Sequence, residues 1–386
     1  MKKVISTERL PIKMWLEELD EATFTQVKNL ANLPFAYKHI PIMPDSHVGY
    51  GMPIGSVLAT RDVVVPNAVG VDIGCGMCAQ KTSLVSLSPD QLQSIVKAAR
   101  QTIPVGATWH QQDQDKNLMP TGHKKLKIVR KEYAQALKQL GSLGGGNHFI
   151  EIQKGSDGHI WVMIHSGSRN LGYKVANYYN EKANKLNERY YSQVTAKMDL
   201  AFLPLETPEA KDYLAEMEYC VEFALANRKL MMRRMMEAIE SVAGKFETEP
   251  IINESHNFAA WEKHFGKQVL VHRKGATRAF KGQLGMIPGS QGTQSYIVRG
   301  LGNKESFKSC SHGAGRKLSR RQAQKQLDLK AEIKRLNDQN IVHGMRNTKD
   351  LDEAPGAYKD INEVMDNQRD LAKIVVELKP LAVIKG

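Results

Sequence analysis

Hydrophobic and polar positions along the chain follow two patterns, one typical of short strands and one typical of helices. Runs rich in β-branched residues, punctuated by proline or glycine, occur at 56–60 (SVLAT) and 62–66 (DVVVP). Longer apolar runs that lead into turns occur at 160–167 (IWVMIHSG) and 267–275 (KQVLVHRKG). All four are predicted to be strands, and the last two to be buried.

Capping signals mark the predicted helices. The segment SPDQ (88–91) combines a capping box with proline at the first helical position, which predicts a helix over 89–102. Thr207-Pro208 opens a second helical pattern that runs to about Val242. Residues 317–337 predict one basic amphipathic helix, whose charged face is either simply solvated or turned toward a polyanion. The mixture predicts an α/β fold whose strand order the sequence does not reveal.

The composition is that of an ordinary soluble globular protein, with 386 residues, 41% of them hydrophobic and 25% charged. This length suggests two ordinary domains or one large one, and no linker marks a boundary. No apolar run approaches the roughly 20 residues of a membrane span. The N-terminal MKKVISTERLPIKMW lacks the apolar core of a signal peptide. We therefore expect a cytoplasmic protein that does not contact a membrane.

The charge balance and the cysteine content indicate which class of partner to expect and whether disulfides are expected. The chain has 54 Lys and Arg against 41 Asp and Glu, a formal charge of +13. Such a surplus favours a polyanionic partner through counterion release, although many basic proteins bind no nucleic acid. Four cysteines are too few for a disulfide scaffold in a chain of this length. They are expected to be buried, catalytic or metal-bound.

Polar side chains gather where strand-like runs meet glycine-rich turns. Glycine lets the backbone approach a ligand closely and exposes its N–H groups. Seven segments have this form: MPDSHVGYG (43–51), GVDIGCGMC (70–78), GGGNHFIE (144–151), HSGSR (165–169), NESHN (253–257), PGSQG (288–292) and SCSHGAGR (309–316). Seven such segments carrying His, Cys, Asp, Asn, Ser or Arg predict a functional centre rather than a set of ordinary turns.

Asp72 and Cys75 leave one tight turn three residues apart. A carboxylate and a thiolate so close suggest metal ligation, but a buried cysteine beside a turn-capping aspartate explains the pair equally simply. Cys75 and Cys78 also form a CxxC, which is either half a zinc site or a redox pair. The sequence has no second CxxC, so it excludes a zinc site built from two such pairs.

Three histidines occur in sequence surroundings similar to those of the Asp72–Cys75 turn. His148, His165 and His256 each end or follow an apolar or glycine-rich run. Singly each is more often structural, but together with Asp72 and Cys75 they suggest two metal sites bridged by the thiolate. Imidazole and thiolate suit zinc or other transition metals, and a carboxylate adds tolerance for Mn. His47 stays ambiguous, and the other histidines are interpreted as surface or structural: His39, His110, His123, His159, His264, His272 and His343.

His312 fits neither pattern, because a metal-bound histidine is usually held rigidly by its neighbours. The segment SCSHGAGR predicts a nucleophile on an exposed, flexible loop. Its backbone N–H groups and Arg316 would be available to phosphate.

In this set of motifs the chain resembles the RtcB family of GTP-dependent RNA ligases. MPDSHVGYG, GVDIGCGM, GNHFIE, HSGSR, HN, PGSxG, SCSHGAGR and the terminal Lys385-Gly386 stand in the family's order along the whole chain. The resemblance implies one large domain over 1–386, with mixed β-sheets surrounded by helices and a central cleft. It also implies joining of RNA 3′-phosphate or 2′,3′-cyclic phosphate ends to 5′-hydroxyl ends, in tRNA splicing or RNA repair.

The resemblance further implies the cofactors and the residues that use them. GTP and two Mn²⁺ ions are expected, with His312 as the nucleophile that carries GMP before GMP passes to the RNA 3′-phosphate. Asp72, Cys75, His148, His165 and His256 are the implied metal ligands, with Asp72 and His256 on one metal, His148 and His165 on the other, and Cys75 between. The implied nucleotide-binding residues are Asn147, His148, Phe149, Ile150, Glu151, His256, Asn257, Pro288, Gly289, Ser290, Gln291, Ser295, His312, Gly313, Ala314, Gly315 and Lys385. Arg169 and Arg316 would hold RNA phosphates, and Tyr358 would stack on the base.

Other implied properties are a monomeric state and an archease-type activating partner. The chain departs from the family at Gln291, where methionine is expected, and at Cys78, where asparagine is expected. Two other functions fit part of the pattern. A binuclear metal phosphoesterase would explain the ligands but not His312, and a non-catalytic RNA-binding protein would explain only the charge. Dependence of RNA joining on GTP separates the three.

Overall fold

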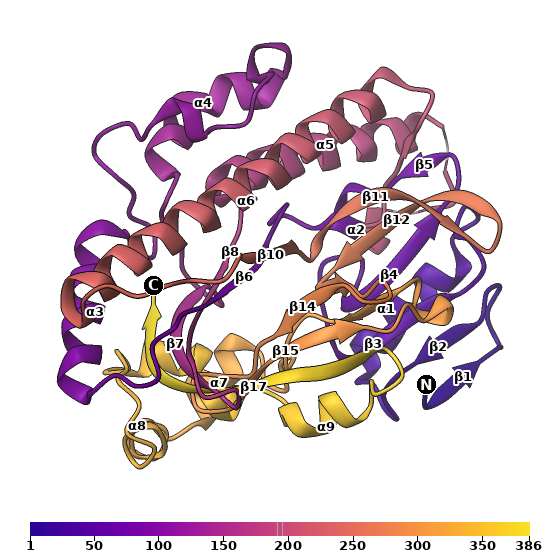
Figure 1. Cartoon of the computed structure of the whole chain (residues 1–386). Helices are drawn as coiled ribbons and strands as arrows, with labels where there is room; N and C mark the ends of the chain where they lie inside the picture. Colours follow the sequence, from indigo (N-terminus) through magenta and orange to yellow (C-terminus); the bar gives the residue numbers. More distant parts are fainter. Residues whose placement is uncertain (191, 195) are drawn as a thin grey trace.

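The computed structural model describes residues 1–190, 192–194 and 196–386. Two large sheets dominate the mixed α/β fold (Figure 1). The six-stranded sheet has the order β1 (Lys3–Ile5), β2 (Ile12–Met14), β3 (Ile40–His47), β4 (Ile54–Thr60), β12 (Lys267–Lys274) and β11 (Asn257–His264). The seven-stranded sheet has the order β10 (Ile252–Ser255), β6 (Gly76–Lys81), β8 (Ile160–Ser166), β7 (Phe149–Gly155), β17 (Ala372–Lys385), β15 (Ser295–Gly300) and β14 (Leu284–Ile287).

Two small sheets and the helices complete the fold. β13 (Ala276–Arg278) pairs with β16 (Ser309–Ser311), and β5 (Val63–Val64) pairs with β9 (Leu203–Pro204). The helices are α1 (Glu21–Asn32), α2 (Pro66–Val69), α3 (Pro89–Thr102), α4 (Lys127–Gln139), α5 (Arg169–Arg189), α6 (Pro208–Ala243), α7 (Arg320–Gln326), α8 (Leu329–Asn337) and α9 (Ile361–Asp366). β2 and β3 pair in parallel, and the other paired strands are antiparallel. The expected mixed-sheet α/β class is confirmed, while the single domain over 1–386 stays a prediction.

The seven-stranded sheet is covered by helices on one face and curls over its other face. Ile150 and Ile152 of β7 pack with residues of α3 and α6, and α5 runs beside α6 (Figure 1). The opposite face carries a second apolar cluster whose members, such as Met77 and Met286, all come from this sheet. Since the first and last strands, β10 and β14, also contact each other, the sheet curls on itself. β17 lies between β7 and β15, and its last residue, Lys385, pairs with Phe149 at the start of β7.

The helices over 89–102 and 208–242 are confirmed, and their caps explain where they begin. Ser88 makes the reciprocal capping box with Gln91, and Pro89 occupies the first helical turn of α3. The Thr207 hydroxyl accepts the N–H of Ala210 at the start of α6. The strand predictions at 56–60, 160–167 and 267–275 correspond to β4, β8 and β12, with bounds shifted by one or two residues.

Two predicted elements are wrong. Residues 317–337 form two helices, because the Asp328 carboxylate accepts the N–H of Ala331 at 2.7 Å and starts α8 afresh. Short polar side chains favour such caps over helix interiors. Residues 62–66 are a strand only at Val63–Val64, since Pro66 lacks the N–H for a ladder and begins α2 instead. Within the described residues, no helix combines the length and apolar character needed to cross a membrane.

Candidate active site

One edge of the seven-stranded sheet gathers the predicted metal ligands. In the order β10, β6, β8, β7 neighbouring strands are antiparallel, so the end of β10, the start of β6, the end of β8 and the start of β7 share this edge. His256 follows β10, Cys75 precedes β6, His165 lies near the end of β8 and His148 precedes β7. Strand pairing alone therefore brings together four residues that are far apart in the sequence.

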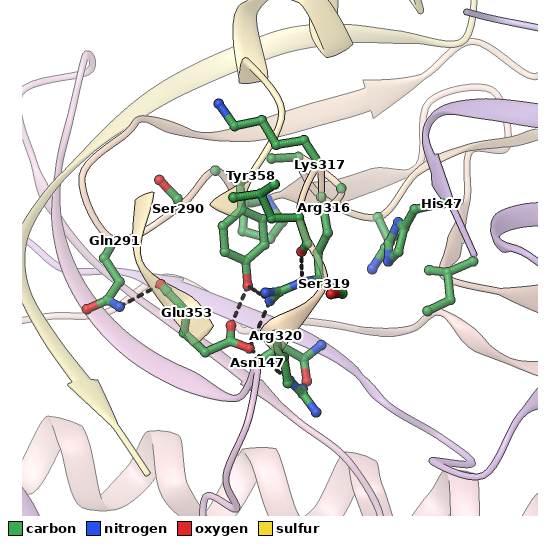
Figure 2. A pocket seen from close by; sticks show the side chains of 18 of the residues that line it. His47, Asn147, Ser290, Gln291, Arg316, Lys317, Ser319, Arg320, Glu353 and Tyr358 are labelled. Carbon is green, nitrogen blue, oxygen red and sulfur yellow. Dashed lines mark hydrogen bonds and ion pairs between the residues drawn. The ribbon is translucent and has the colours of Figure 1, made fainter. Parts of the chain in front are cut away.

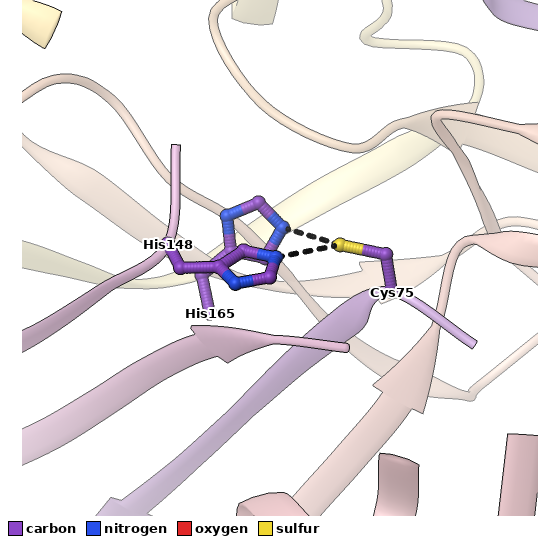
Figure 3. A group of neighbouring side chains, drawn as sticks. All are labelled: Cys75, His148 and His165. Carbon is purple, nitrogen blue, oxygen red and sulfur yellow. Dashed lines mark hydrogen bonds between the residues drawn. The ribbon is translucent and has the colours of Figure 1, made fainter. Parts of the chain in front are cut away.

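The donor atoms of these side chains converge. The Cys75 Sγ lies 3.5 Å from the His148 Nε2 and 3.2 Å from the His165 Nε2. The ligand atoms of these three buried residues all lie within 4.8 Å of one another (Figure 3). His165 Nε2 is also 3.3 Å from His256 Nε2, and His148 Nε2 is 3.1 Å from Asp72 Oδ2. All five expected ligands therefore belong to one cluster, in which Asp72 contacts His148.

Backbone carbonyls determine which ring nitrogen of His148 and of His165 faces Cys75. His148 Nδ1 lies 3.0 Å from the carbonyl oxygen of Leu143, and His165 Nδ1 lies 3.1 Å from that of Asn147. A carbonyl only accepts, so both rings donate through Nδ1, and the neutral His165 ring leaves an Nε2 lone pair toward Cys75. Metal-bound histidines are commonly held in this way.

The electrostatics of the cluster also suit a cation. Burial lowers the pKa of His165 and of His256 well below the ordinary value, so both rings are neutral. Burial raises the pKa of the Cys75 thiol well above its usual range. Burial opposes ionisation of Asp72, but the hydrogen bond with His148 outweighs it and lowers the pKa of that carboxyl. Neutral imidazoles with facing lone pairs beside a thiol and a carboxylate fit a transition-metal ion.

A cavity of about 790 Å³ opens beside this cluster and is lined from both large sheets. Val48 and Ile54 come from the β3–β4 hairpin, and Phe149 and Glu151 come from β7. Twelve of the expected nucleotide-binding residues line it: Asn147, Phe149, Glu151, Pro288, Gly289, Ser290, Gln291, His312, Gly313, Ala314, Gly315 and Lys385. His165, which belongs to the cluster around Cys75, also lines the cavity. A volume of this size accommodates a nucleotide.

Asp45 holds His312 in this wall. The Asp45 Oδ2 lies 2.7 Å from His312 Nδ1 and also accepts the backbone N–H groups of His312 and Gly313. The His312 side chain is only 13% exposed, and residues 313–315 are buried. The expectation of an exposed, flexible loop is therefore wrong, because a buried carboxylate from β3 anchors it. Its ring packs edge-on against that of His256, with centroids 4.7 Å apart, so His312 lies beside the cluster around Cys75.

Glu353 organises a second wall of the cavity, and sequence analysis missed it. Its carboxylate accepts Arg316 at 3.1 Å, Arg320 at 3.3 Å and Lys385 at 3.2 Å, and it also accepts the Tyr358 hydroxyl (Figure 2). Burial alone would raise the pKa of Glu353, but Lys385 and Arg316 outweigh it and lower that pKa to about 2. The only sequence signal was an acid placed just before the APGAYKD segment that carries Tyr358.

The unexpected Gln291 connects to the same wall. Its side-chain amide donates to the backbone carbonyl of Glu353 at 2.8 Å (Figure 2). The turn at 288–291 is thereby linked to the Glu353 segment.

Glu151 is a buried carboxyl inside the cavity. Its neighbour Gln153 donates to it at 2.6 Å, and Lys385 contributes a nearby positive charge. Burial raises the pKa of Glu151 to about 8 against these two effects. Strand alternation explains its orientation: Phe149 and Glu151 face the cavity, while Ile150 between them packs in the apolar core. The Ile150 side chain is therefore turned away from any nucleotide.

Two other expected nucleotide-binding residues, Asn257 and Ser295, hydrogen-bond to the segments that form the site. Asn257 donates to the backbone carbonyl of Asp72 and accepts the N–H of Gly275. The Ser295 hydroxyl accepts from Gln153 and from the N–H of Gly289. These contacts position the turn that carries Asp72 and the 288–291 turn, and neither side chain is among those that line the cavity.

The two arginines expected to hold RNA phosphates are already engaged with the protein. Arg316 donates to Glu353 and to the backbone carbonyls of Leu318 and Asp352. Arg169 donates to the Ser142 hydroxyl and to the carbonyl of Gly106. Lys317, Arg320 and Arg321, which sequence analysis did not single out, also line the cavity and carry its more exposed positive charges.

Cys78 does not belong to the cluster formed by Cys75, His148 and His165. It is fully buried in the core cluster shared with α3 and α6, and its Sγ lies 3.8 Å from the carbonyl oxygen of Arg228. Burial raises the pKa of this thiol to about 12. A protonated thiol in an apolar setting favours core packing over zinc binding or redox exchange with Cys75.

Comparison with known proteins agrees with this geometry. The family model described as "tRNA-splicing ligase RtcB" matches residues 26–129 and 115–386. The RNA-splicing ligase RtcB of Escherichia coli K12 is 38% identical over 409 residues, covering 100% of this chain and 99% of that protein. The tRNA-splicing ligase RtcB of Thermococcus kodakarensis is 32% identical, covering 95% of this chain and 91% of that protein. The RNA-splicing ligase RtcB of Mycobacterium tuberculosis is also 32% identical, covering 94% of this chain and 100% of that protein. The chain therefore belongs to the RtcB family.

Proposed function

We propose that this protein is an RNA ligase that joins a 3′-phosphate or 2′,3′-cyclic phosphate end to a 5′-hydroxyl end, with GTP as the second substrate. Relatives named as RNA-splicing or tRNA-splicing ligases over nearly the whole chain support the ligase activity. The observation that carries the mechanism is His312, held through Nδ1 by Asp45 in a nucleotide-sized cavity beside the Cys75 cluster.

Asp45 defines the role of each imidazole nitrogen. A carboxylate accepts the Nδ1–H, so the lone pair of His312 lies on Nε2. We infer that Nε2 attacks the α-phosphorus of GTP, forming a P–N bond, while the bond to the β-phosphate oxygen breaks and pyrophosphate leaves with the electron pair. The imidazolium that results keeps its Nδ1 proton and donates it in a hydrogen bond to the ionised Asp45, as in other histidines paired with a buried acid.

Two further transfers complete the reaction. An oxygen of the RNA 3′-phosphate attacks the phosphorus of the bound GMP, and the P–N electron pair returns to Nε2 of His312. The RNA 5′-hydroxyl then gives its proton to solvent and attacks the 3′-phosphorus, and GMP leaves with the electron pair of the broken P–O bond. A cyclic phosphate is first opened by water to the 3′-phosphate. No oxidant or reductant is needed in this sequence.

The chain's own residues would bind, orient and neutralise the reactants. We propose Asp72, Cys75, His148, His165 and His256 as ligands of two Mn²⁺ ions, which when bound would neutralise phosphate charge. Glu151, Lys385 and Tyr358 line the cavity, and we propose that the first two read the polar edge of guanine and that Tyr358 stacks on it. Lys317, Arg320 and Arg321, with Arg169 and Arg316 behind them, would attract the RNA backbone.

Labelling with radioactive GTP tests the first step directly. The protein is incubated with Mn²⁺ and GTP labelled at the α-phosphate, then denatured, and retained label is measured in wild type, His312→Ala and His343→Ala. His343 lies outside the cavity and serves as the matched histidine control. We expect acid-labile label in wild type and His343→Ala and none in His312→Ala. Absence of label from metal-loaded wild type would overturn the nucleotide step, and phosphate-ester hydrolysis would then be tested as the alternative.

A further inference from the structure

Arg228 is a buried arginine of α6 that contacts the backbone beneath the metal cluster. Its side chain is 0% exposed. One terminal nitrogen, Nη1, donates to the carbonyl oxygens of Gly74 and Ser166, each at 2.9 Å. The other, Nη2, donates to the Ser255 hydroxyl at 3.2 Å, and Nε donates to Asn253 Oδ1 at 2.7 Å.

Three of these four acceptors are sequence neighbours of predicted metal ligands. Gly74 precedes Cys75, Ser166 follows His165, and Ser255 precedes His256. These segments belong to three different strands or loops, and strand pairing alone leaves their ends free to fray at the sheet edge. One planar guanidinium connects all three, because its donors are fixed relative to one another.

We propose that Arg228 is a positioning residue that sets the spacing of Cys75, His165 and His256 for metal binding. The inference rests on the proposed metal centre and deepens it, because it assigns the ligand geometry to a residue that touches neither metal nor substrate. Metal sites depend on such outer contacts, and their loss commonly weakens metal affinity about 10- to 100-fold. A lysine cannot replace this arginine, since a single ammonium lacks the planar fork that reaches all four acceptors.

The chain offers a matched control for the substitution. Arg273 of β12 is also 0% exposed and also bridges segments, donating to Glu262, to the Ser309 hydroxyl and to the Phe307 carbonyl. None of its acceptors is adjacent in sequence to a predicted metal ligand. Arg228→Lys and Arg273→Lys therefore each remove a buried guanidinium that bridges several segments, and only the first touches the ligand segments.

Cobalt(II) is the probe, because a thiolate bound to this ion gives a charge-transfer absorption band in the near ultraviolet. Wild type, Cys75→Ala, Arg228→Lys and Arg273→Lys are titrated with cobalt, and folding of each is checked by circular dichroism. We expect the band in wild type and its loss in Cys75→Ala. Arg228→Lys should bind cobalt about 10- to 100-fold more weakly than wild type, while Arg273→Lys keeps its affinity within about threefold.

The outcomes separate the two proposals. A wild type without the thiolate band overturns the proposed metal centre itself. A normal wild type with undiminished affinity in Arg228→Lys, or with equal losses in both lysine variants, overturns the role of Arg228 alone. If Arg228→Lys does not fold, Ser255→Ala and Ser309→Ala provide the same comparison, because each removes one acceptor of the corresponding arginine. Equal cobalt affinities in those two variants would overturn the inference.

Discussion

The carboxylate of Asp45 lies 2.7 Å from Nδ1 of His312, although 267 residues separate the two in the chain. Asp45 is buried, and the same Oδ2 accepts two backbone N–H groups of the His312 loop. Burial would raise the pKa of Asp45, but the hydrogen bond with His312 outweighs it and lowers that pKa, so the acid is ionised at neutral pH. This pair fixes both the direction of the ring and the nitrogen that is free to react.

Replacing Asp45 by asparagine is expected to slow formation of the histidine–GMP adduct by about 10²- to 10⁴-fold, because the amide cannot stabilise the imidazolium by charge. The rate of label retention from α-labelled GTP measures the effect. Asp328→Asn, which alters a helix cap on α8 outside the cavity, serves as the control. A wild-type labelling rate in Asp45→Asn would show that this carboxylate has no part in the reaction.

Above about pH 8, where Glu151 is ionised, replacing it by glutamine is expected to reduce the preference for GTP over ATP by about 10- to 100-fold, since hydrogen bonds to a charged group contribute about 1.5–3 kcal/mol. Guanine presents two neighbouring N–H donors that an ionised carboxylate can accept, whereas adenine does not. Competition between the two nucleotides in the labelling reaction measures the preference. Glu377→Gln on β17 lies outside the cavity and should leave the preference intact.

The carboxyl group of Glu151 also leads us to expect that GTP binding depends on pH. The pKa of Glu151 is raised to about 8, so below that pH the group is protonated and cannot accept both guanine donors. Binding should therefore strengthen as pH rises toward and through 8, and the ratio of wild-type to Glu151→Gln affinities should rise with it. A ratio that stays flat from pH 6 to 9 contradicts the assignment of Glu151 to guanine.

Glu353 predicts how stability changes with pH. Its pKa is about 2 in the folded protein against an ordinary value of 4.5, so ionised Glu353 stabilises the fold by up to about 3 kcal/mol. For a lowered pKa, this contribution is fully present above about 4.5 and is lost as pH falls toward 2. Unfolding of wild type and Glu353→Gln is compared from pH 3 to 7. The stability difference should be constant above pH 5.5 and should shrink below 4.5; a constant difference throughout contradicts the prediction.

Two glycines of the His312 loop should respond differently to alanine. Gly315 has φ +75°, and a Cβ there would lie 2.2 Å from the backbone oxygen of Asp45. Gly315→Ala is expected to cost about 1–3 kcal/mol of stability or more, from backbone strain and this clash. The nearest atom to a Cβ on Gly313 is 3.5 Å away, so Gly313→Ala should leave the melting temperature nearly unchanged. Equal melting temperatures for the two variants would contradict the description of this loop.

Local signals in the sequence were reliable where one segment decides its own structure. The capping box at Ser88 and the Thr207-Pro208 start predicted α3 and α6 because caps act within a single turn. The same kind of signal was missed at Asp328, where an aspartate inside an amphipathic pattern starts a new helix. At 309–316 the glycines suggested flexibility, but the buried contact with Asp45 is distant in sequence and could not be read locally.

The sequence by itself determined the family, the residue types available for chemistry, and the segments that carry them, because motif order and local capping are properties of the linear chain. Only the tertiary structure decided how these residues act together. Strand pairing joined Cys75, His148, His165 and His256 at one sheet edge. Long-range packing placed Arg228 behind them, Asp45 against His312 and Glu353 in the cavity wall. The physical reason is that hydrogen-bond partners of a buried group are chosen by the whole packed fold, and their identity leaves little trace in the spacing of residues along the chain.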